Sequence, residues 1–137
     1  MIILTLGKAC VQIRKEWKCR ATPMNMSNQR SHWVVKNIWT KAWKEEVATA
    51  VMVQKHYWDK KTQKALPFLK SKIVIQLSKS VLMDHDGAYS SVKPILDGLT
   101  EAGIIFNDSP KYIELEVKQI KIKQKSEEKT QILINNF

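Results

Sequence analysis

The sequence predicts an α+β domain in which a mixed β-sheet carries two main helices on one face. Three patterns lead to this prediction. Short stretches of alternating apolar and polar residues indicate strands, two longer stretches with apolar residues at helical spacing indicate helices, and the chain ends in two consecutive strands. The 137 residues are the length of one domain, and no repeat or Pro/Gly/Ser-rich linker divides them. We therefore expect residues 1–137 to form a single domain.

The N-terminal part is predicted to contain a strand, a loop and a long helix. The strand covers Met1 to Ala9 and continues past Cys10, and the loop covers Ala21 to Gln29. The helix runs from about Ser31 to Tyr57. Apolar residues recur along one side of it at Val35, Trp39, Ala42, Trp43, Val47, Ala50 and Val51. Trp39 and Trp43 could stack on nucleic-acid bases, but their helical spacing favours burial in the hydrophobic core.

The middle of the chain is predicted to form a basic connector, a half-buried strand and a second helix. The connector is Lys60 to Leu66, and the alternating segment Lys72 to Leu82 is the strand. The helix runs from Gly87 or Ala88 to Ala102 and ends with Gly103 as its cap. Because Pro94 lies inside it, either its first turns are irregular or the helix proper begins near Lys93. The buried side is expected at Val92, Ile95, Leu96, Leu99 and Ala102.

The C-terminal part is predicted to add two strands. A short apolar stretch, Ile104 to Phe106, leads into a turn at Asn107 to Pro110. Tyr112 to Lys123 alternates clearly and indicates a strand, Ser126 to Lys129 indicates a polar hairpin turn, and Thr130 to Ile134 indicates the last strand.

The charge balance is the unusual feature of the composition. The 23 Lys and Arg residues exceed the 13 acidic residues and give a formal net charge of +10, whereas the 44% hydrophobic and 26% charged residues are ordinary values. Such a surplus favours polyanionic partners, which are DNA, RNA or an anionic membrane face. The alternative is a soluble basic protein with no such partner.

Membrane insertion and export are not expected. The longest apolar runs, such as Ile2 to Leu6 and Ile73 to Leu77, are too short for a span of about 20 residues. No secretory leader is recognisable, so we expect a cytoplasmic protein in which Cys10 and Cys19 are reduced thiols, although the two could pair. Histidines at zinc-like spacing do not accompany them.

Four of the five aspartates lie within 25 positions, at Asp84, Asp86, Asp97 and Asp108. Carboxylates oppose the approach of DNA unless a cation lies between them and the phosphates. Mg²⁺ is such a cation, and it prefers oxygen ligands. Asp84 and Asp86 follow a predicted strand and face the same side if the strand geometry persists, and Asp108 lies in a later turn that can return beside them. We therefore predict Asp84, Asp86 and Asp108 as metal ligands; alternatively, the pair is a solvated strand end, with Asp86 capping the helix.

Lys93 is the fourth candidate. It lies on the helix that follows the paired aspartates, away from the predicted buried side, where it could stabilise developing charge on a phosphate or orient a water. The competing interpretation is one exposed lysine among many. Further lysines are expected to contact phosphates without regard to base sequence, namely Lys70, Lys72, Lys79, Lys111, Lys121 and Lys123.

The same residues form a motif. Along the chain it reads Asp84-His85-Asp86-Gly87, Lys93, Asp97-Gly98-Leu99, Glu101-Ala102-Gly103, Asn107-Asp108-Ser109-Pro110-Lys111-Tyr112 and Lys118. This motif resembles that of the RusA family of Holliday-junction resolvases, which are small endonucleases associated with prophages. A softer likeness covers Asn25 to Trp43, with His32-Trp33 and Lys41-Ala42-Trp43, so that the resemblance reaches from residue 25 to residue 118, about two-thirds of the chain.

The resemblance implies a RusA-like fold and a crossover junction endodeoxyribonuclease. Members are homodimers that bind four-way DNA junctions and cut two strands of like polarity symmetrically with Mg²⁺, for which Mn²⁺ is expected to substitute. The three catalytic aspartates of the family fall on Asp84, Asp86 and Asp108, and its catalytic lysine falls on Lys93. The resemblance thus implies a role in DNA recombination and repair.

The sequence departs from the family pattern at three places. Gly87 stands where the family has Asn, Lys93 follows Asp86 by seven residues instead of four, and Asn107 replaces the first residue of an Asp-Asp pair. Three residues are close to one helical turn, so Lys93 can still reach the same side. These departures leave open a non-catalytic DNA-binding module with a decayed site, and a structural phage protein is the third interpretation.

Overall fold

The computed structural model describes residues 1–24 and 33–136 and confirms the α+β fold class. Its strands are β1 (Ile2–Leu6), β2 (Ala9–Ile13), β3 (Glu16–Arg20), β4 (Ser71–Lys79), β5 (Ile113–Lys121) and β6 (Lys129–Asn136). Its α-helices are α1 (Trp33–Gln54), α2 (Lys60–Lys64), α3 (His85–Ser91) and α4 (Lys93–Glu101), with 3₁₀ turns at Lys55–Tyr57 and Lys125–Glu127. The predicted start of the first helix at Ser31, residue His32 and most of the predicted loop lie outside the described residues.

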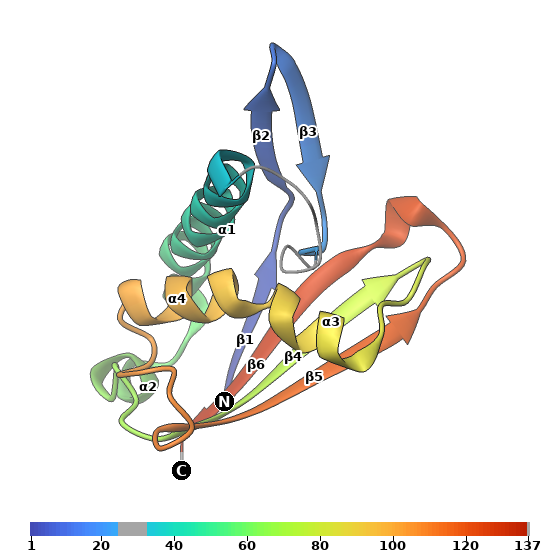
Figure 1. Ribbon diagram of the computed structural model, residues 1–137. Helices are drawn as coiled ribbons and strands as arrows, with labels where there is room; N and C mark the ends of the chain where they lie inside the picture. The colour runs from blue at the N-terminus through green and yellow to red at the C-terminus, as the bar shows by residue number, and fades with distance from the viewer. Residues whose placement is uncertain (25–32, 137) are drawn as a thin grey trace.

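Four strands form a mixed sheet in the order β1-β6-β4-β5. The β4–β5 pair is parallel, and the β1–β6 and β4–β6 pairs are antiparallel. The helices α1, α3 and α4 lie on one side of this sheet, as Figure 1 shows. The predicted hairpin between the last two strands is wrong, because β4 lies between β5 and β6 and pairs with both. The apolar side chains of β4 explain its central place, since burial on a central strand requires neighbours on both edges.

The first predicted strand is two strands that belong to different sheets. The chain leaves the main sheet after Leu6 and forms a separate ribbon of β2 and β3, which projects beyond the helices in Figure 1. At the corner, the Gly7 amide donates to Glu46 Oε1 over 2.7 Å, and a Cβ at Gly7 would lie 2.8 Å from that oxygen. The strand β3 was not predicted. Its turn places Arg14 and Lys15 at φ of 52° and 69°, without the Asn-Gly signal that usually marks such turns.

The ribbon also joins the two cysteines. Cys10 and Cys19 are opposite each other in the β2–β3 register and form a disulfide. The prediction of reduced thiols is therefore wrong for this structure. Without β3, the sequence offered no reason to place the two side chains face to face.

The helical predictions hold with two refinements. Trp39 and Trp43 are 5% and 2% exposed and belong to the core, as their spacing indicated. The second predicted helix is divided at Val92 into α3 and α4, and Gly103 ends α4 with a φ of +77°. The basic connector contains a short helix, α2, whose first turn is capped by Asp59.

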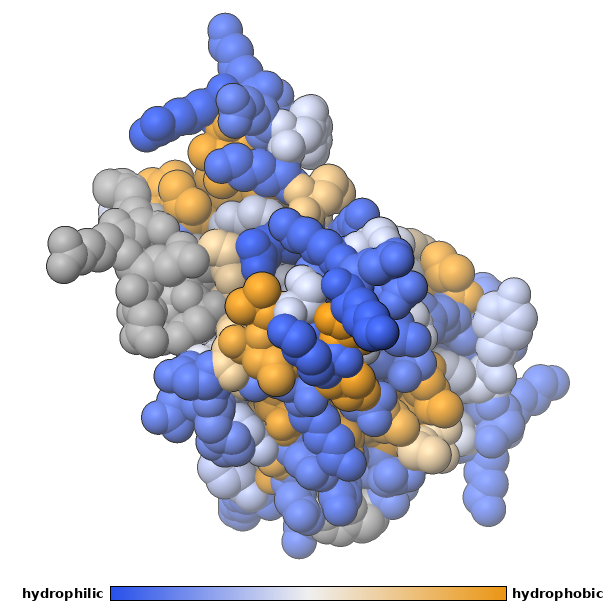
Figure 2. All heavy atoms as spheres, turned by 90° about the vertical axis from the view of Figure 1, so that its right-hand side faces the viewer, coloured by the Kyte–Doolittle hydropathy of each residue, from blue (hydrophilic) through white to orange (hydrophobic). Residues whose placement is uncertain are grey.

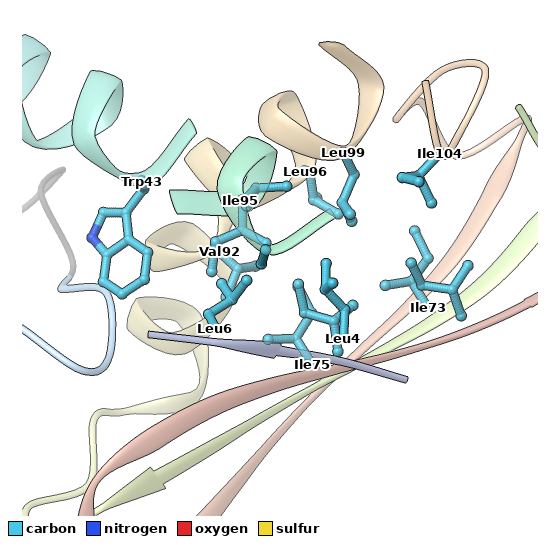
Figure 3. Close-up of a cluster of buried hydrophobic side chains, with 14 of the residues drawn as sticks. Leu4, Leu6, Trp43, Ile73, Ile75, Val92, Ile95, Leu96, Leu99 and Ile104 are labelled. Atoms are coloured by element: carbon cyan, nitrogen blue, oxygen red, sulfur yellow. The ribbon is translucent and has the colours of Figure 1, made fainter. Parts of the chain in front are cut away.

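The core lies between the inner face of the sheet and the helices α1 and α4. Figure 3 shows Trp43 of α1 and Ile95 and Leu99 of α4 above Leu4 and Ile75 of the sheet. The hydrophobic residues of the sheet that are at most 5% exposed are Ile2, Leu4, Leu6, Ile73, Ile75, Leu77, Ile132 and Ile134. Burial of each such side chain contributes about 1.5–3 kcal/mol, so this layer holds the helices in place.

Gly98 sets the distance between the two helices. A Cβ built at Gly98 would lie 3.0 Å from Val47 Cβ and 3.3 Å from Lys44 Cα on α1. The salt bridge between Lys44 and Glu101, at 3.0 Å, spans the same contact. The close approach therefore depends on the absence of a side chain at Gly98.

We predict that Gly98→Ala destabilises the protein. Overpacking costs about 1–3 kcal/mol, and the better helix propensity of Ala returns about 1 kcal/mol, so a net loss of roughly 1 kcal/mol is expected. Urea denaturation would measure it. The control is Thr49→Ala at an exposed position of α1, which should change stability by less than about 0.5 kcal/mol. Equal stability of the Gly98→Ala and parent proteins would contradict the close contact.

Candidate functional site

The paired aspartates lie at the start of α3 and not at a strand end. Because β4 ends at Lys79, the strand geometry does not persist to Asp84. Asp84 is instead the N-cap of α3, and its Oδ1 accepts from the Gly87 amide over 2.9 Å. Asp86 lies in the first turn of the helix. The capping residue is thus Asp84, whereas the sequence had suggested Asp86. Both carboxylates are exposed.

The other two candidates meet in an ion-pair cluster. Lys93 is the first residue of α4, and its Nζ lies 2.7 Å from Asp97 Oδ1, one helical turn further along. The same Nζ donates to Asp108 Oδ2, which comes from the turn before β5. We call these three residues, Lys93, Asp97 and Asp108, the lysine–aspartate cluster. It joins the first half of α4 to the turn that carries Asp108.

Backbone contacts fix the loop that carries Asp108. Ile105 forms a parallel bridge with Phe68, in which the Phe68 amide donates to the Ile104 carbonyl and the Phe106 amide donates to the Phe68 carbonyl, both over 3.0 Å. Beyond Asp108, the Ser109 amide donates to Asn107 Oδ1 over 2.8 Å. Asn107 therefore has a structural role in this turn, although it replaces an acidic residue of the family pattern.

The ion pairs shift the pKa values of two members of the cluster, Lys93 and Asp108. The hydrogen bond from Lys93 holds the pKa of Asp108 below its ordinary value, and burial opposes this shift only in part. The hydrogen bonds to Asp108 and then to Asp97 raise the pKa of Lys93. The side chains are 60% exposed at Lys93, 32% at Asp97 and 25% at Asp108, so solvent screens the interaction. Lys93 and Asp108 are therefore both charged at neutral pH.

The predicted three-carboxylate site is not assembled. Within residues 1–24 and 33–136, no group of three or more His, Cys, Asp or Glu side chains could hold a metal ion. The carboxylates Asp84, Asp86 and Asp108 have the donor chemistry that Mg²⁺ requires, but their positions do not form such a group. An ammonium group lies between the Asp97 and Asp108 carboxylates instead, which are therefore arranged around a cation.

Asp97 is the member of the cluster that the sequence analysis did not select as a site residue. The available signal was its spacing, because a lysine and an aspartate four residues apart on a helix face each other. His85 packs against Tyr89 with ring centroids 4.8 Å apart. Tyr89 in turn accepts from the Val117 amide over 3.2 Å, which attaches α3 to the edge strand β5.

The predicted phosphate-contacting lysines do not share one environment. Lys70, Lys111 and Lys123 are exposed, and Lys72 is half-buried. Lys121 is exposed and donates to the Ser80 carbonyl. Lys79 differs from all of these, because it is only 6% exposed. The positive charge of the protein is thus distributed over several surfaces and one buried position.

Comparisons with known proteins leave the family open. No protein-family model matches the chain, and no curated protein matches it. Among the described residues, no helix is both long and apolar enough to cross a membrane.

We predict that Lys93→Met raises the pKa of Asp108 toward its ordinary range, because the hydrogen bond from Lys93 is the main cause of the lowered value. The depressed pKa stabilises the folded protein above the unfolded-state pKa of Asp, and this contribution is lost as the pH falls through the lower, folded-state value. For an exposed ion pair the contribution is about 0.5–1 kcal/mol after screening. Carboxyl ¹³C NMR titration would measure the pKa. Lys44→Met, which removes a different ion pair, should leave Asp108 unchanged, and an unaltered pKa in Lys93→Met would contradict the assignment.

Proposed function

We propose that this protein is a Mg²⁺-dependent DNA endonuclease of the RusA type that cleaves branched DNA such as four-way junctions. The observation that carries the proposal is the lysine–aspartate cluster, in which two carboxylates from separate segments surround a cation at the surface of a strongly basic protein. Carboxylates repel DNA phosphates unless a cation lies between them. A protein that both attracts DNA and cleaves its phosphodiester bonds therefore needs acidic groups that hold a cation. The motif likeness from Asp84 to Lys118 supports the same function.

Lys93 is the residue on which this proposal depends most. Its ammonium has three protons, and two of them are directed at Asp97 and Asp108. A DNA phosphate that reaches Lys93 competes with these carboxylates for the same donor. When Lys93 turns to the phosphate, its charge stabilises the phosphate oxygens, and the two carboxylates become available to another cation.

The proposed Mg²⁺ would supply an activated water and stabilise charge on the phosphate. Asp84, Asp86 and Asp108 are its proposed ligands, and Mn²⁺ is expected to substitute for it. Since no three-acid group exists among the described residues, this assignment requires the start of α3 and the Asp108 turn to come together when DNA and metal bind. Asp97, already beside Asp108, is the nearest additional donor.

The proposal extends to assembly and location. A four-way junction has near two-fold symmetry, so a symmetric homodimer presents one site to each of the two strands that are cut. The activity belongs in the cytoplasm, where the DNA substrate lies.

We predict that Asp108→Asn abolishes cleavage of a labelled four-way junction in Mg²⁺ while binding of the junction persists. The substitution removes the carboxylate charge but keeps the size of the side chain. Lys93→Met should lower the cleavage rate by about 100- to 1,000-fold, the usual loss when one stabilising donor is removed. Gel analysis of strand products, with three-way, flap and linear duplex DNA in parallel, would measure both effects.

The matched control is Asp59→Asn. Asp59 is exposed and caps α2, and Asn can also cap a helix, so this variant should cleave as the parent does. Full cleavage by Asp108→Asn would refute the site. Loss of cleavage in Asp59→Asn as well would show that the assay reports folding.

A non-catalytic DNA-binding module is the second candidate. It is favoured by two observations. Lys93 already forms a salt bridge with Asp108, and no three-acid group is present among the described residues. In this case the parent protein binds branched DNA and leaves it intact in both Mg²⁺ and Mn²⁺. That result would replace the nuclease proposal.

A further inference from the structure

A second polar feature lies apart from the lysine–aspartate cluster. A pocket of about 510 Å³ opens where the end of β3 meets the end of β4 and the turn between β5 and β6. Its walls include none of Lys93, Asp97 and Asp108. In Figure 1 this region lies between the foot of the β2–β3 ribbon and the far end of the sheet, and in Figure 2 hydrophilic side chains cover much of that side of the molecule. We call it the β3–β4 pocket.

The charges of the β3–β4 pocket are strongly unbalanced. Four cationic side chains line it, Lys8, Arg20, Lys79 and Lys125, and Glu128 is the one acidic residue of the described lining, which gives a formal charge of 4 − 1 = +3. Glu128 is already engaged, because its Oε2 accepts from the Ser80 amide over 3.0 Å and from the Ser80 hydroxyl over 3.1 Å. Burial by itself raises the pKa of Glu128, but the hydrogen bonds from Ser80 and the charges of Lys79 and Lys125 together hold it below its ordinary value.

Lys79 is the residue that distinguishes this pocket from a basic surface. It is the last residue of β4, on the inner side of the strand, and only 6% of it is exposed. Its Nζ donates to Thr22 Oγ1 over 3.1 Å, and no carboxylate of the described residues forms a salt bridge with it. Burial and the nearby charge of Arg20 lower the pKa of Lys79, and the charge of Glu128 opposes this shift only in part. A buried ammonium whose hydrogen-bond partner is neutral destabilises the folded protein, because the loss of hydration is not offset by an opposite charge.

Arg20 adds a second unsatisfied cation. Its Nε donates to the Thr22 carbonyl over 3.3 Å, and no salt bridge to it is present in the described part of the chain. Within residues 1–24 and 33–136 the two other guanidinium nitrogens make no further hydrogen bond, and they form a planar fork that suits the oxygens of a phosphate. Two cations that repel each other across a pocket are stabilised together when one anion binds between them.

We propose that the β3–β4 pocket binds a phosphate group, with Lys79 and Arg20 as its principal charged contacts and Lys125 at its rim. Phosphate matches the site because it carries negative charge and several acceptor oxygens, whereas the pocket offers ammonium, guanidinium and hydroxyl donors. The pocket is larger than one phosphate, so it has room for the attached part of a nucleotide. The phosphate can belong to a DNA backbone or to a free nucleotide, and both share this chemistry. The proposal does not depend on nuclease activity.

The experiment is a titration of the full-length protein with inorganic phosphate, followed by ¹H–¹⁵N NMR. We expect the amide signals of Thr22, Ser80 and Val81 to shift until phosphate saturates the site. The chemical shifts of the Asp97 and Asp108 amides should not change. Lys79→Gln should weaken phosphate binding at least tenfold, because it removes the buried charge and keeps a polar side chain. Arg20→Gln should weaken it similarly.

Matched variants keep the test decisive if a buried substitution disturbs the fold. Lys125→Ala, at an exposed rim position, should weaken binding about threefold, and Lys64→Ala, exposed at the end of α2, should not change it. The NMR spectrum and the thermal melting of each variant show whether it is folded. Unshifted pocket signals at saturating phosphate, or equal affinity in the parent, Lys125→Ala and folded Lys79→Gln proteins, would overturn the proposal.

Two further titrations identify the source of the phosphate. If the pocket takes a DNA backbone phosphate, Lys79→Gln lowers the affinity for duplex DNA, and inorganic phosphate competes with DNA for the parent protein. If it takes a free nucleotide, a deoxynucleoside monophosphate binds more tightly than inorganic phosphate, and the DNA affinity of Lys79→Gln equals that of the parent. Either result supports the phosphate site, and an absence of both effects contradicts it.

Discussion

The packing of α4 against α1 at Gly98 is the constraint on which the position of the candidate site depends. The Val47 side chain and the Lys44 backbone occupy the space that any side chain at Gly98 would need. Ile95 and Leu99, on either side of it, anchor α4 to the sheet. Because the same helix carries Lys93 and Asp97 on its exposed side, this contact fixes two of the three members of the lysine–aspartate cluster. The third arrives on a loop held by the bridge between Phe68 and Ile105.

Glutamine side chains form hydrogen bonds with backbone groups at or near both edges of the main sheet. On the edge strand β1, the Gln54 side chain accepts from the Thr5 amide over 3.0 Å and donates to the Thr5 carbonyl over 2.6 Å. Near the other edge, the Gln119 side chain bonds to both the amide and the carbonyl of Met83. Backbone groups at sheet edges otherwise invite pairing with another chain. Gln54 therefore attaches α1 to the sheet and satisfies backbone groups of the edge strand β1, whereas Gln119 of β5 attaches the segment before α3 by satisfying the backbone groups of Met83.

The charge of the protein is organised in two opposite ways. In the lysine–aspartate cluster, a lysine and two carboxylates satisfy one another at the surface. In the β3–β4 pocket, Lys79 and Arg20 form no salt bridge within the described part of the chain, and Glu128, the acidic residue of the described lining, is hydrogen-bonded to Ser80. A net charge of +10 accounts for attraction to polyanions in general, but it does not distinguish these two sites. The distinction comes from burial and from which side chains the fold places face to face.

By itself, the sequence determined the α+β class, the helix that contains Trp39 and Trp43, and the strands around Ile75 and Ile132. It also determined the end of α4 at Gly103, where the backbone is left-handed. These features follow from local periodicity and backbone preference, which neighbouring residues specify directly. The tertiary structure decided the remainder. It placed β4 between β5 and β6, formed the ribbon that joins Cys10 to Cys19, and made Asp84 a helix cap. It also brought Asp97 and Lys93 together with Asp108, and it buried Lys79. Each of these outcomes depends on contacts between residues distant in sequence, for which local patterns carry no information, because strand order and burial are set by the packing of the whole core.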